Sequence, residues 1–225
     1  MKKILWGLLA AALVLTACSQ AASVSSTDPL TIQYSFASAF RLAELYGCAG
    51  AAPVHADLRA ADFQDLQQVD MDIRIGQPEH LTAPAYQIGT EDLLVIVNRK
   101  NPVGRLSAAQ VGGLFSGQIL SWKAVGGSDA PVQAWVFPAG EDVEQVFEQS
   151  VLGGTPVSPE ARLAATPDEM TQAIASDVEA IGILPRHWKT GTVTDVFSLA
   201  GIPVLAILPA QPTGETAQLL ACLQK

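Results

Sequence analysis

Short β-type runs and helical segments alternate from Leu30 onward, and this alternation limits the possible folds more than any other feature. Three runs, at 30–34, 54–58 and 69–75, have the composition or the alternation of strands. Between them, 39–46 and 61–68 have the spacing of helices, and Ser38 is the expected N-cap of the first. Strand and helix in regular alternation predict a parallel sheet covered by helices, and therefore an α/β fold.

The second half of the chain continues this pattern. Its most apolar run, Leu93–Val97, lies in a strand expected over 91–98 and is typical of a strand buried on both faces. Two α/β units therefore appear, and a ligand cleft is expected between them at the carboxyl ends of the strands. Further helices are expected over 107–115, 141–152, 167–176 and 216–223, and further strands over 132–137, 180–184, 192–198 and 204–208.

The N-terminus has the features of an export signal. Two lysines, Lys2 and Lys3, precede an apolar run, Ile4–Leu15, which is shorter than the roughly 20 residues that cross a membrane. The run ends in Leu15-Thr16-Ala17-Cys18, which resembles the lipobox of bacterial lipoproteins, so lipid is expected on Cys18. The alternative is an ordinary signal peptide with a chance cysteine. We expect 1–18 to be the signal with its lipidation cysteine and 19–29 to be a flexible tether.

Composition and charge exclude several classes of partner. The chain is 49% hydrophobic and 16% charged, which is typical of a globular protein, and its net charge is −9. Clusters of Lys and Arg are absent, so we expect no binding to nucleic acid and membrane contact through the lipid anchor only.

Cysteine and histidine residues are few. If Cys18 carries lipid, Cys48 and Cys222 remain, and an exported chain can join them by a disulfide that ties the first helix to the last. Two buried free thiols are the alternative. The three histidines are scattered and no ligand spacing is present, so we expect no metal site and no cofactor.

The stretch from Leu94 to Gly127 carries a family resemblance. A buried strand, Val95-Ile96-Val97-Asn98, is followed by Asn101-Pro102-Val103, Leu106-Ser107, Leu114-Phe115-Ser116-Gly117-Gln118-Ile119 and Ser121-Trp122-Lys123-Ala124-Val125-Gly126-Gly127. This order resembles the phosphate-type substrate-binding proteins of bacterial ABC transporters, a branch of the type II periplasmic-binding-protein fold. More weakly, 147–152 and 180–185 resemble later parts of that family.

The resemblance implies a two-lobed fold in which each lobe is a mostly parallel sheet flanked by helices. Residues 30–90 with about 199–225 would form lobe 1, and 91–198 would form lobe 2. The first lobe matches the family only in layout and is short. Phe115, Ile119 and Trp122 are expected in the core of the second lobe.

The family's anion-binding loop is altered in this chain. It reads Arg-x-x-Gly-Ser-Gly-Thr in those proteins and corresponds here to residues 137–143, Phe-Pro-Ala-Gly-Glu-Asp-Val. Phe137 stands in place of the arginine, Gly140 is retained, and Glu141 and Asp142 bring carboxylates to a helix start that would otherwise attract an anion. Two like charges about 4 Å apart repel by roughly 4 kcal/mol at an effective dielectric of about 20. Phosphate binding of the usual kind is therefore not expected. The two acids are expected on a solvated rim or, alternatively, at the ligand.

The other candidate ligand residues follow expected strands. The segment Ser35–Ser38 lies where the family's first anion loop lies, with simple N-capping as the alternative, and Gly76-Gln77 would face the same cleft. Trp135 and Phe137 would line the cleft or pack in the core. The full candidate set is Ser35, Phe36, Ser38, Gly76, Gln77, Phe137, Gly140, Glu141 and Asp142.

Two functions are weighed. The first is a lipid-anchored extracytoplasmic solute-binding protein that delivers a small molecule, an anion being one option, to an ABC permease. The second is a degenerate binding fold that serves as an extracellular interaction or sensing module. An enzyme is not expected, because no nucleophile elbow and no metal-ligand cluster is present.

Overall fold

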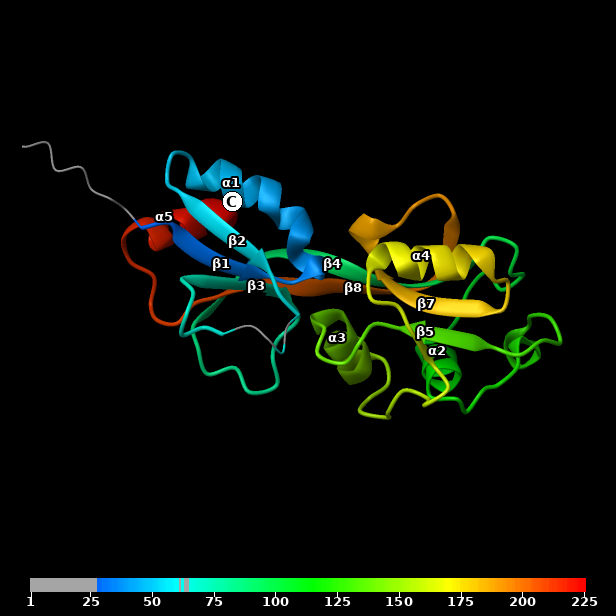
Figure 1. The fold of residues 1–225 in the computed structure, drawn as a ribbon. Helices are drawn as coiled ribbons and strands as arrows, with labels where there is room; N and C mark the ends of the chain where they lie inside the picture. The colour runs from blue at the N-terminus through cyan, green and yellow to red at the C-terminus, as the bar shows by residue number, and fades with distance from the viewer. Residues whose placement is uncertain (1–27, 61, 63–64) are drawn as a thin grey trace, which may run out of the picture.

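The computed structural model describes residues 28–60, 62 and 65–225 (Figure 1). The expected signal peptide with Cys18, and the tether as far as residue 27, lie outside the described residues. None of the helices in the described part is long and apolar enough to cross a membrane. The elements are β1 (Leu30–Tyr34), η1 (Phe36–Arg41), α1 (Leu42–Ala49), β2 (Val54–Leu58), β3 (Met71–Ile75), β4 (Ala85–Asn98), α2 (Ala108–Phe115), η3 (Trp122–Val125), β5 (Gln133–Val136), α3 (Asp142–Ser150), β6 (Arg162–Leu163), α4 (Pro167–Ser176), β7 (Ala180–Pro185), η4 (Arg186–Trp188), β8 (Val193–Ile207) and α5 (Gly214–Leu223).

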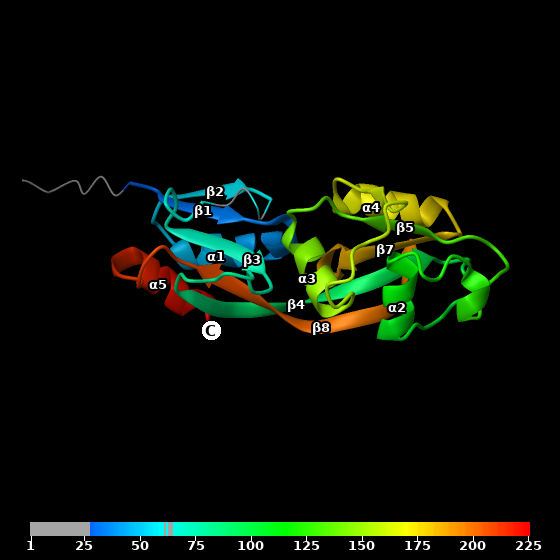
Figure 2. The same ribbon diagram turned by 90° about the horizontal axis from the view of Figure 1, so that it is seen from below.

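One mixed sheet runs through the whole molecule in the order β2-β1-β3-β8-β4-β7-β5-β6. Parallel pairs form both ends, β1 with β2 and β3, and β5 with β6 and β7, whereas β4 and β8 pair antiparallel. Figures 1 and 2 show two groups of elements joined by these two long strands. We call β1–β3 with η1, α1 and α5 the first lobe, and β5–β7 with α2–α4 the second lobe. The expected two-lobed α/β fold is confirmed.

The strand β8 corrects the expectation of two separate strands over 192–198 and 204–208. It is a single element that pairs with β4 in both lobes, and the register shifts between Glu91 and Leu93 where the chain passes from one lobe to the other. Gly201 lies in this crossing with φ 73°, and its N–H donates to the Asp92 carboxylate at 2.9 Å. A glycine in an apolar run is a turn signal in the sequence, but here it bends a continuous strand.

Two expectations for the first lobe need correction. The η1 helix begins one turn earlier than expected, so its N-cap is Ser35, while the Ser38 hydroxyl donates to the Ile73 carbonyl at 2.8 Å. Of the helix expected over 61–68, residues 61, 63 and 64 lie outside the described residues. Asp65–Gln68 form a turn in which the Asp65 carboxylate accepts from the Gln67 N–H at 2.9 Å. Short side chains that bond to nearby backbone in this way favour turns over helix.

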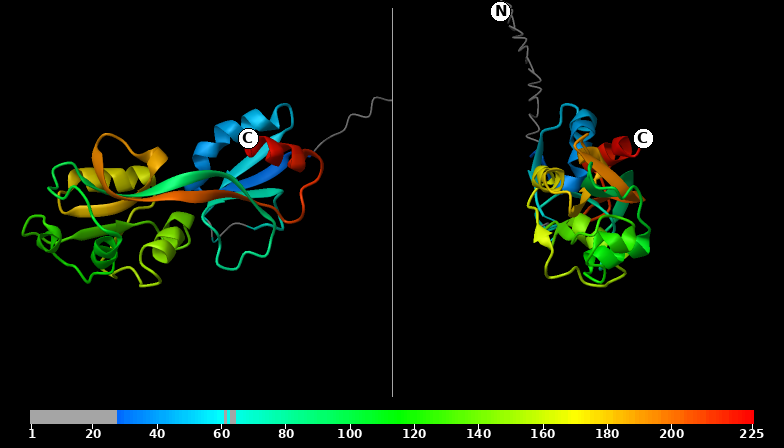
Figure 3. Two further views of the ribbon diagram at one scale, coloured as in Figure 1. Left: turned by 180° about the vertical axis from the view of Figure 1, so that it is seen from behind. Right: turned by 90° about the vertical axis from the view of Figure 1, so that its right-hand side faces the viewer.

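The core lies on the covered faces of the sheet. Met71, Ile73 and Ile75 of β3 are fully buried in the first lobe, and Phe115 and Trp122 are fully buried in the second, as expected. A disulfide between Cys48 and Cys222 joins α1 to α5, with the two Cα atoms 5.7 Å apart. Figure 3 shows α1 and α5 side by side on the same side of the first lobe. The C-terminal helix is therefore held covalently to the start of the fold.

Candidate functional site between the two lobes

The N-terminus of α3, in the second lobe, docks against the end of β3 in the first lobe. The Asp142 carboxylate accepts hydrogen bonds from the Ile75 N–H and from the Val143 N–H, each at 2.8 Å. Asp142 is fully buried, so it does not lie on a solvated rim. The amides at a helix start and a strand end, which can hold an external anion, are here satisfied by a carboxylate of the protein itself.

The charge of Asp142 is only partly compensated. Burial away from water raises its pKa, while hydrogen bonds from the Ser35 hydroxyl and the Ile75 N–H, together with the positive charge of Arg74, act in the opposite direction. Burial is the largest of these effects. The Asp142 carboxyl therefore links the two lobes through hydrogen bonds, and it carries a proton more readily than an exposed aspartate does.

Aromatic side chains close the cleft next to Asp142. The ring of Phe36 lies 4.8 Å, centre to centre, from the ring of Phe137, which is fully buried at the position where the resembling family has arginine. The Trp188 indole N–H points toward the Phe36 carbonyl at 3.5 Å. Trp135, by contrast, faces the Arg162 guanidinium at 5.6 Å. Where an arginine would attract an anion, this chain has an apolar contact between lobes.

The structure brings together only part of the expected ligand set. Ser35 and Ser38 are buried, and the Ser35 oxygen caps η1 by accepting from the Ser38 N–H at 3.3 Å. Gly140 is buried before α3, and its carbonyl accepts from the Asp62 N–H at 3.1 Å. Gly76 and Gln77 line a different cavity, beside Pro203 and the strand β8.

Three hollows are lined by residues of both lobes. The first has a volume of about 380 Å³ and is lined by Phe36, Glu141, Trp188 and the first turn of α4. The second has a volume of about 440 Å³ and lies between Arg74 and the residues of α3 that begin at Gln145. The third is the cavity at Gly76 and Gln77, which has a volume of about 340 Å³ and is also lined by residues of α3. A solute that binds between the lobes in this conformation has these spaces available.

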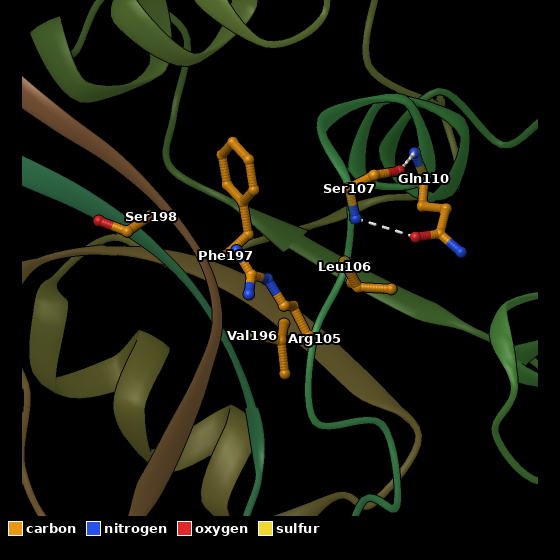
Figure 4. A pocket seen from close by; sticks show the side chains of 7 residues that line it. All are labelled: Arg105, Leu106, Ser107, Gln110, Val196, Phe197 and Ser198. Carbon is orange, nitrogen blue, oxygen red and sulfur yellow. Dashed lines mark hydrogen bonds between the residues drawn. The ribbon is translucent and has the colours of Figure 1, made fainter.

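A further hollow lies away from the cleft, in the second lobe (Figure 4). Its volume is about 640 Å³, and Leu106, Ser107 and Gln110 face Phe197 across it. Ser107 and Gln110 are bonded to each other in a capping box, at 2.9 and 3.2 Å, as the dashed lines in Figure 4 show. Because none of the candidate residues lines this hollow, we do not assign the site to it.

Several more acids in and beside the cleft are held away from water. Burial raises the pKa of Asp72 to about 7, that of Glu141 to about 7 and that of Glu144 to about 8, from ordinary values of 3.8 to 4.5. Neighbouring carboxylates add to the shift, since Asp142 acts on both Asp72 and Glu141. Burial and the closeness of these carboxyl groups to one another therefore favour their protonated forms.

We expect the protein to be more stable at pH 5 than at pH 8.5. Because these folded-state pKa values are raised, the native state binds more protons than the unfolded chain between about pH 4 and pH 8, so the free energy of unfolding falls as pH rises through that range. A hydrogen bond from the Gly201 N–H holds the pKa of Asp92 below its usual range, so ionisation of this group affects stability only at lower pH. Melting temperatures measured over this pH range check the prediction. The Glu144→Gln variant should show a smaller change of melting temperature with pH. A melting temperature that rises from pH 5 to pH 8.5 would contradict it.

Gly76→Ala is expected to separate α3 from β3. Gly76 has φ 70°, and an added Cβ would lie 2.3 Å from the Val146 Cγ2 atom. Left-handed backbone costs about 1–2 kcal/mol for alanine, and overpacking typically adds about 1–3 kcal/mol. Gly153→Ala is a matched control, because Gly153 also has positive φ (58°) but nothing within 4 Å of the added atom. Denaturant unfolding should show a clearly larger loss for Gly76→Ala, and equal losses would rule out the clash.

Sequence reasoning missed two charged residues of the cleft, Asp72 and Arg74. Both are buried on the face of β3 opposite to Met71, Ile73 and Ile75. The alternation of 69–75 was the available signal, because it predicts a strand with one polar face. It did not indicate that the polar face would also be buried.

Comparisons with known proteins agree with the two-lobed fold. A family model described as the PBP superfamily domain matches residues 29–220. An ABC-type phosphate transport receptor from Vibrio cholerae has a similar fold, with a TM-score of 0.72 and 19% identity over 87% of this chain and 93% of that chain. A candidate phosphate ABC transporter substrate-binding protein from Clostridium perfringens, solved with bound phosphate, has a TM-score of 0.73 and 15% identity over 87% of this chain and 93% of that chain. The CcmR regulatory domain of Synechocystis PCC6803, in complex with 2-PG, has a TM-score of 0.61 and 16% identity over 87% of this chain and 95% of that chain. The protein belongs to the family of the PBP superfamily domain.

Proposed function

We propose that this chain is a lipid-anchored extracytoplasmic solute-binding protein of an ABC-type uptake system, and that it does not bind its ligand through the usual phosphate site. The family and its two-lobed fold support the first part. The observation that carries the second part is the buried Asp142 carboxylate on the Ile75 and Val143 amides. An oxyanion placed there would have to displace a carboxyl group and then lie beside the other acids of the cleft.

The proposed cycle is opening and closing of the two lobes around the β4 and β8 crossing. Residues 30–90 with 199–225 would move as one body and residues 91–198 as the other. The register shift between Glu91 and Leu93 and the bend at Gly201 lie at this boundary. A lipid on Cys18 would hold the moving domain close to a permease in the same membrane.

Thermal shift with a panel of oxyanions, sugars and amino acids tests the proposal. A ligand at about 100 times its dissociation constant adds roughly 2.7 kcal/mol to the free energy of unfolding, which is readily measured. We expect at least one solute to stabilise the chain and phosphate to leave its melting temperature unchanged. Stabilisation by phosphate at micromolar concentration would overturn the second part of the proposal, and no shift with any compound would overturn the first.

The filled centre of the cleft also favours a second candidate, an extracellular interaction or sensing module that has lost solute binding. The Phe36–Phe137 contact and the Asp142 hydrogen bonds lie at the segment that corresponds to the anion-binding loop of the resembling family. Cross-linking in intact cells distinguishes the two functions. A permease as the main cross-linked partner supports uptake, whereas an exported or membrane partner without transport domains, together with no solute shift, supports the module.

A further inference from the structure

The strand β3 buries two side chains of opposite charge, Asp72 and Arg74, that do not form a close ion pair. Asp72 is 3% exposed and Arg74 is 7% exposed, and both project from the same face because they are two residues apart on a strand. Their backbone positions are therefore about 7 Å apart. Among the ion pairs of the described residues, none joins these two side chains.

Each of the two side chains has an atom without a partner. Within the described part of the chain, Asp72 Oδ1 and Arg74 Nε are buried and make no hydrogen bond. Arg74 is held from one side only, because its Nη2 donates to Gln145 Oε1 at 2.7 Å. Buried polar atoms are normally paired, since leaving one unpaired costs a substantial part of its hydration energy. An unpaired acceptor and an unpaired donor on the same face of a strand suit a ligand that offers both roles.

Both side chains open into the same space. A cavity of about 200 Å³ is lined by Asp72 and Arg74, with Pro78, His80 and Thr82 from the loop that follows β3. Arg74, Pro78 and His80 also line the interlobe hollow of about 440 Å³, which extends to Glu148 on α3. The small cavity suits the compact charged group of a ligand, and the larger hollow suits the rest of the ligand molecule.

The lining excludes simpler ligands. An anion without a positive group would be attracted by Arg74, but it would also be repelled by Asp72 and by the carboxylates of Asp62, Glu79 and Glu148. A plain cation would find Asp72 but would meet the guanidinium of Arg74. A molecule with an ammonium and a carboxylate close together satisfies both, since the carboxylate can accept from the arginine and the ammonium can donate to the aspartate.

We propose that the cavity between β3, the loop 77–84 and α3 binds a small zwitterion of the α-amino acid class, with its carboxylate on Arg74 and its ammonium on Asp72. The acids of the larger hollow favour neutral or basic side chains over acidic ones. This inference rests on the proposed solute-binding function and names its ligand class. It places the ligand outside the Phe36–Trp188 hollow, with which the proposed cavity shares no lining residue.

Isothermal titration of the purified chain tests the proposal. The probes are L-glutamine, L-lysine and L-glutamate, with propionate, which lacks the ammonium, and glycinamide, which lacks the carboxylate. We expect one-to-one binding of glutamine or lysine, with glutamate and both half-probes at least about tenfold weaker, because each loses a charge-assisted hydrogen bond or meets a like charge.

Variants locate the site. Asp72→Asn keeps the shape of the side chain and should fold, since a neutral amide costs less to bury than a carboxylate. Asp72→Asn and Arg74→Gln are each expected to weaken amino-acid binding at least about tenfold by removing one charged contact. Arg59→Gln, which changes a residue lining the Phe36–Trp188 hollow, should leave it unchanged.

The outcomes separate this inference from the proposed function. Amino-acid binding that resists Asp72→Asn and Arg74→Gln but is lost in Arg59→Gln would overturn the site. Binding of a sugar or an oxyanion, and of no amino acid, would overturn the ligand class while the solute-binding function stands. Binding of no compound in the wider panel would overturn both.

Discussion

Asp142→Ala is expected to destabilise the protein by about 2–4 kcal/mol and to create a site for a small carboxylate. The substitution leaves the Ile75 and Val143 N–H groups buried without an acceptor, at a cost of about 1–3 kcal/mol each. Removal of a carboxyl group whose burial is itself unfavourable offsets part of that loss. Denaturant unfolding measures the change, and a melting temperature lower by about 5–15 °C would accompany it for a domain of this size.

Chemical rescue distinguishes loss of a specific contact from general damage. Formate carries the missing carboxylate and is small enough to replace the side chain, so it should raise the melting temperature of Asp142→Ala and leave the native protein unchanged. Asp142→Asn is the matched control, because its amide oxygen still accepts from the Ile75 N–H and its stability should fall less, without rescue. An Asp142→Ala variant as stable as the native chain, or equal formate effects on both proteins, would show that the carboxylate does not hold the lobes together.

Removal of the disulfide between Cys48 and Cys222 is expected to be the most damaging single covalent change. The bond closes a loop across a sequence separation of 174 residues. The chain-entropy relation gives about 5 kcal/mol for a loop of this length, and measured losses of native disulfides are typically about 2–5 kcal/mol. The Cys48→Ser/Cys222→Ser double variant should therefore melt at least about 5–10 °C lower than the native chain. Because α5 packs beside α1, this helix should be the first to lose protection in hydrogen exchange.

Reduction provides the control for that prediction. A thiol-specific reagent should count two more thiols in the reduced, unfolded chain than in the oxidised one, whatever the state of Cys18. Reductant should lower the stability of the native chain and leave that of the double variant unchanged. If the double variant unfolds at the same denaturant concentration as the oxidised protein, the bond makes no contribution.

Local patterns in the sequence were enough to predict most of the fold. Period-two alternation predicted β3 and the apolar run predicted β4. The wrong expectation for β8 depended on a distant partner. The strand β8 continues through Gly201 because β4 pairs along its length, and pairing with a strand more than one hundred residues away is not visible in a local window.

The candidate site was only half predictable. The loss of arginine and hydroxyl side chains over 137–143 was clear from the resemblance, and it directed attention to the start of α3. Neighbouring residues in the sequence could not show whether Asp142 is exposed to solvent or contacts the first lobe, because its partner Ile75 lies 67 residues away. For the same reason Phe137 could be read as a cleft residue or as a core residue until Phe36 was placed against it.

The sequence by itself determined the alternation of strands and helices, the family-like second lobe and the absence of the usual anion-binding side chains. The alternation follows from chain-local physics, since backbone preferences and side-chain periodicity act over a few residues. The other two come from the resemblance to the phosphate-type substrate-binding proteins. Only the tertiary structure decided that the Asp142 carboxylate accepts from the Ile75 N–H. It also decided that Asp72 and Arg74 are both buried on one face of β3. Burial and the energy of a charge depend on what the rest of the chain brings within a few ångströms, and that is set by the packing of α3 on β3.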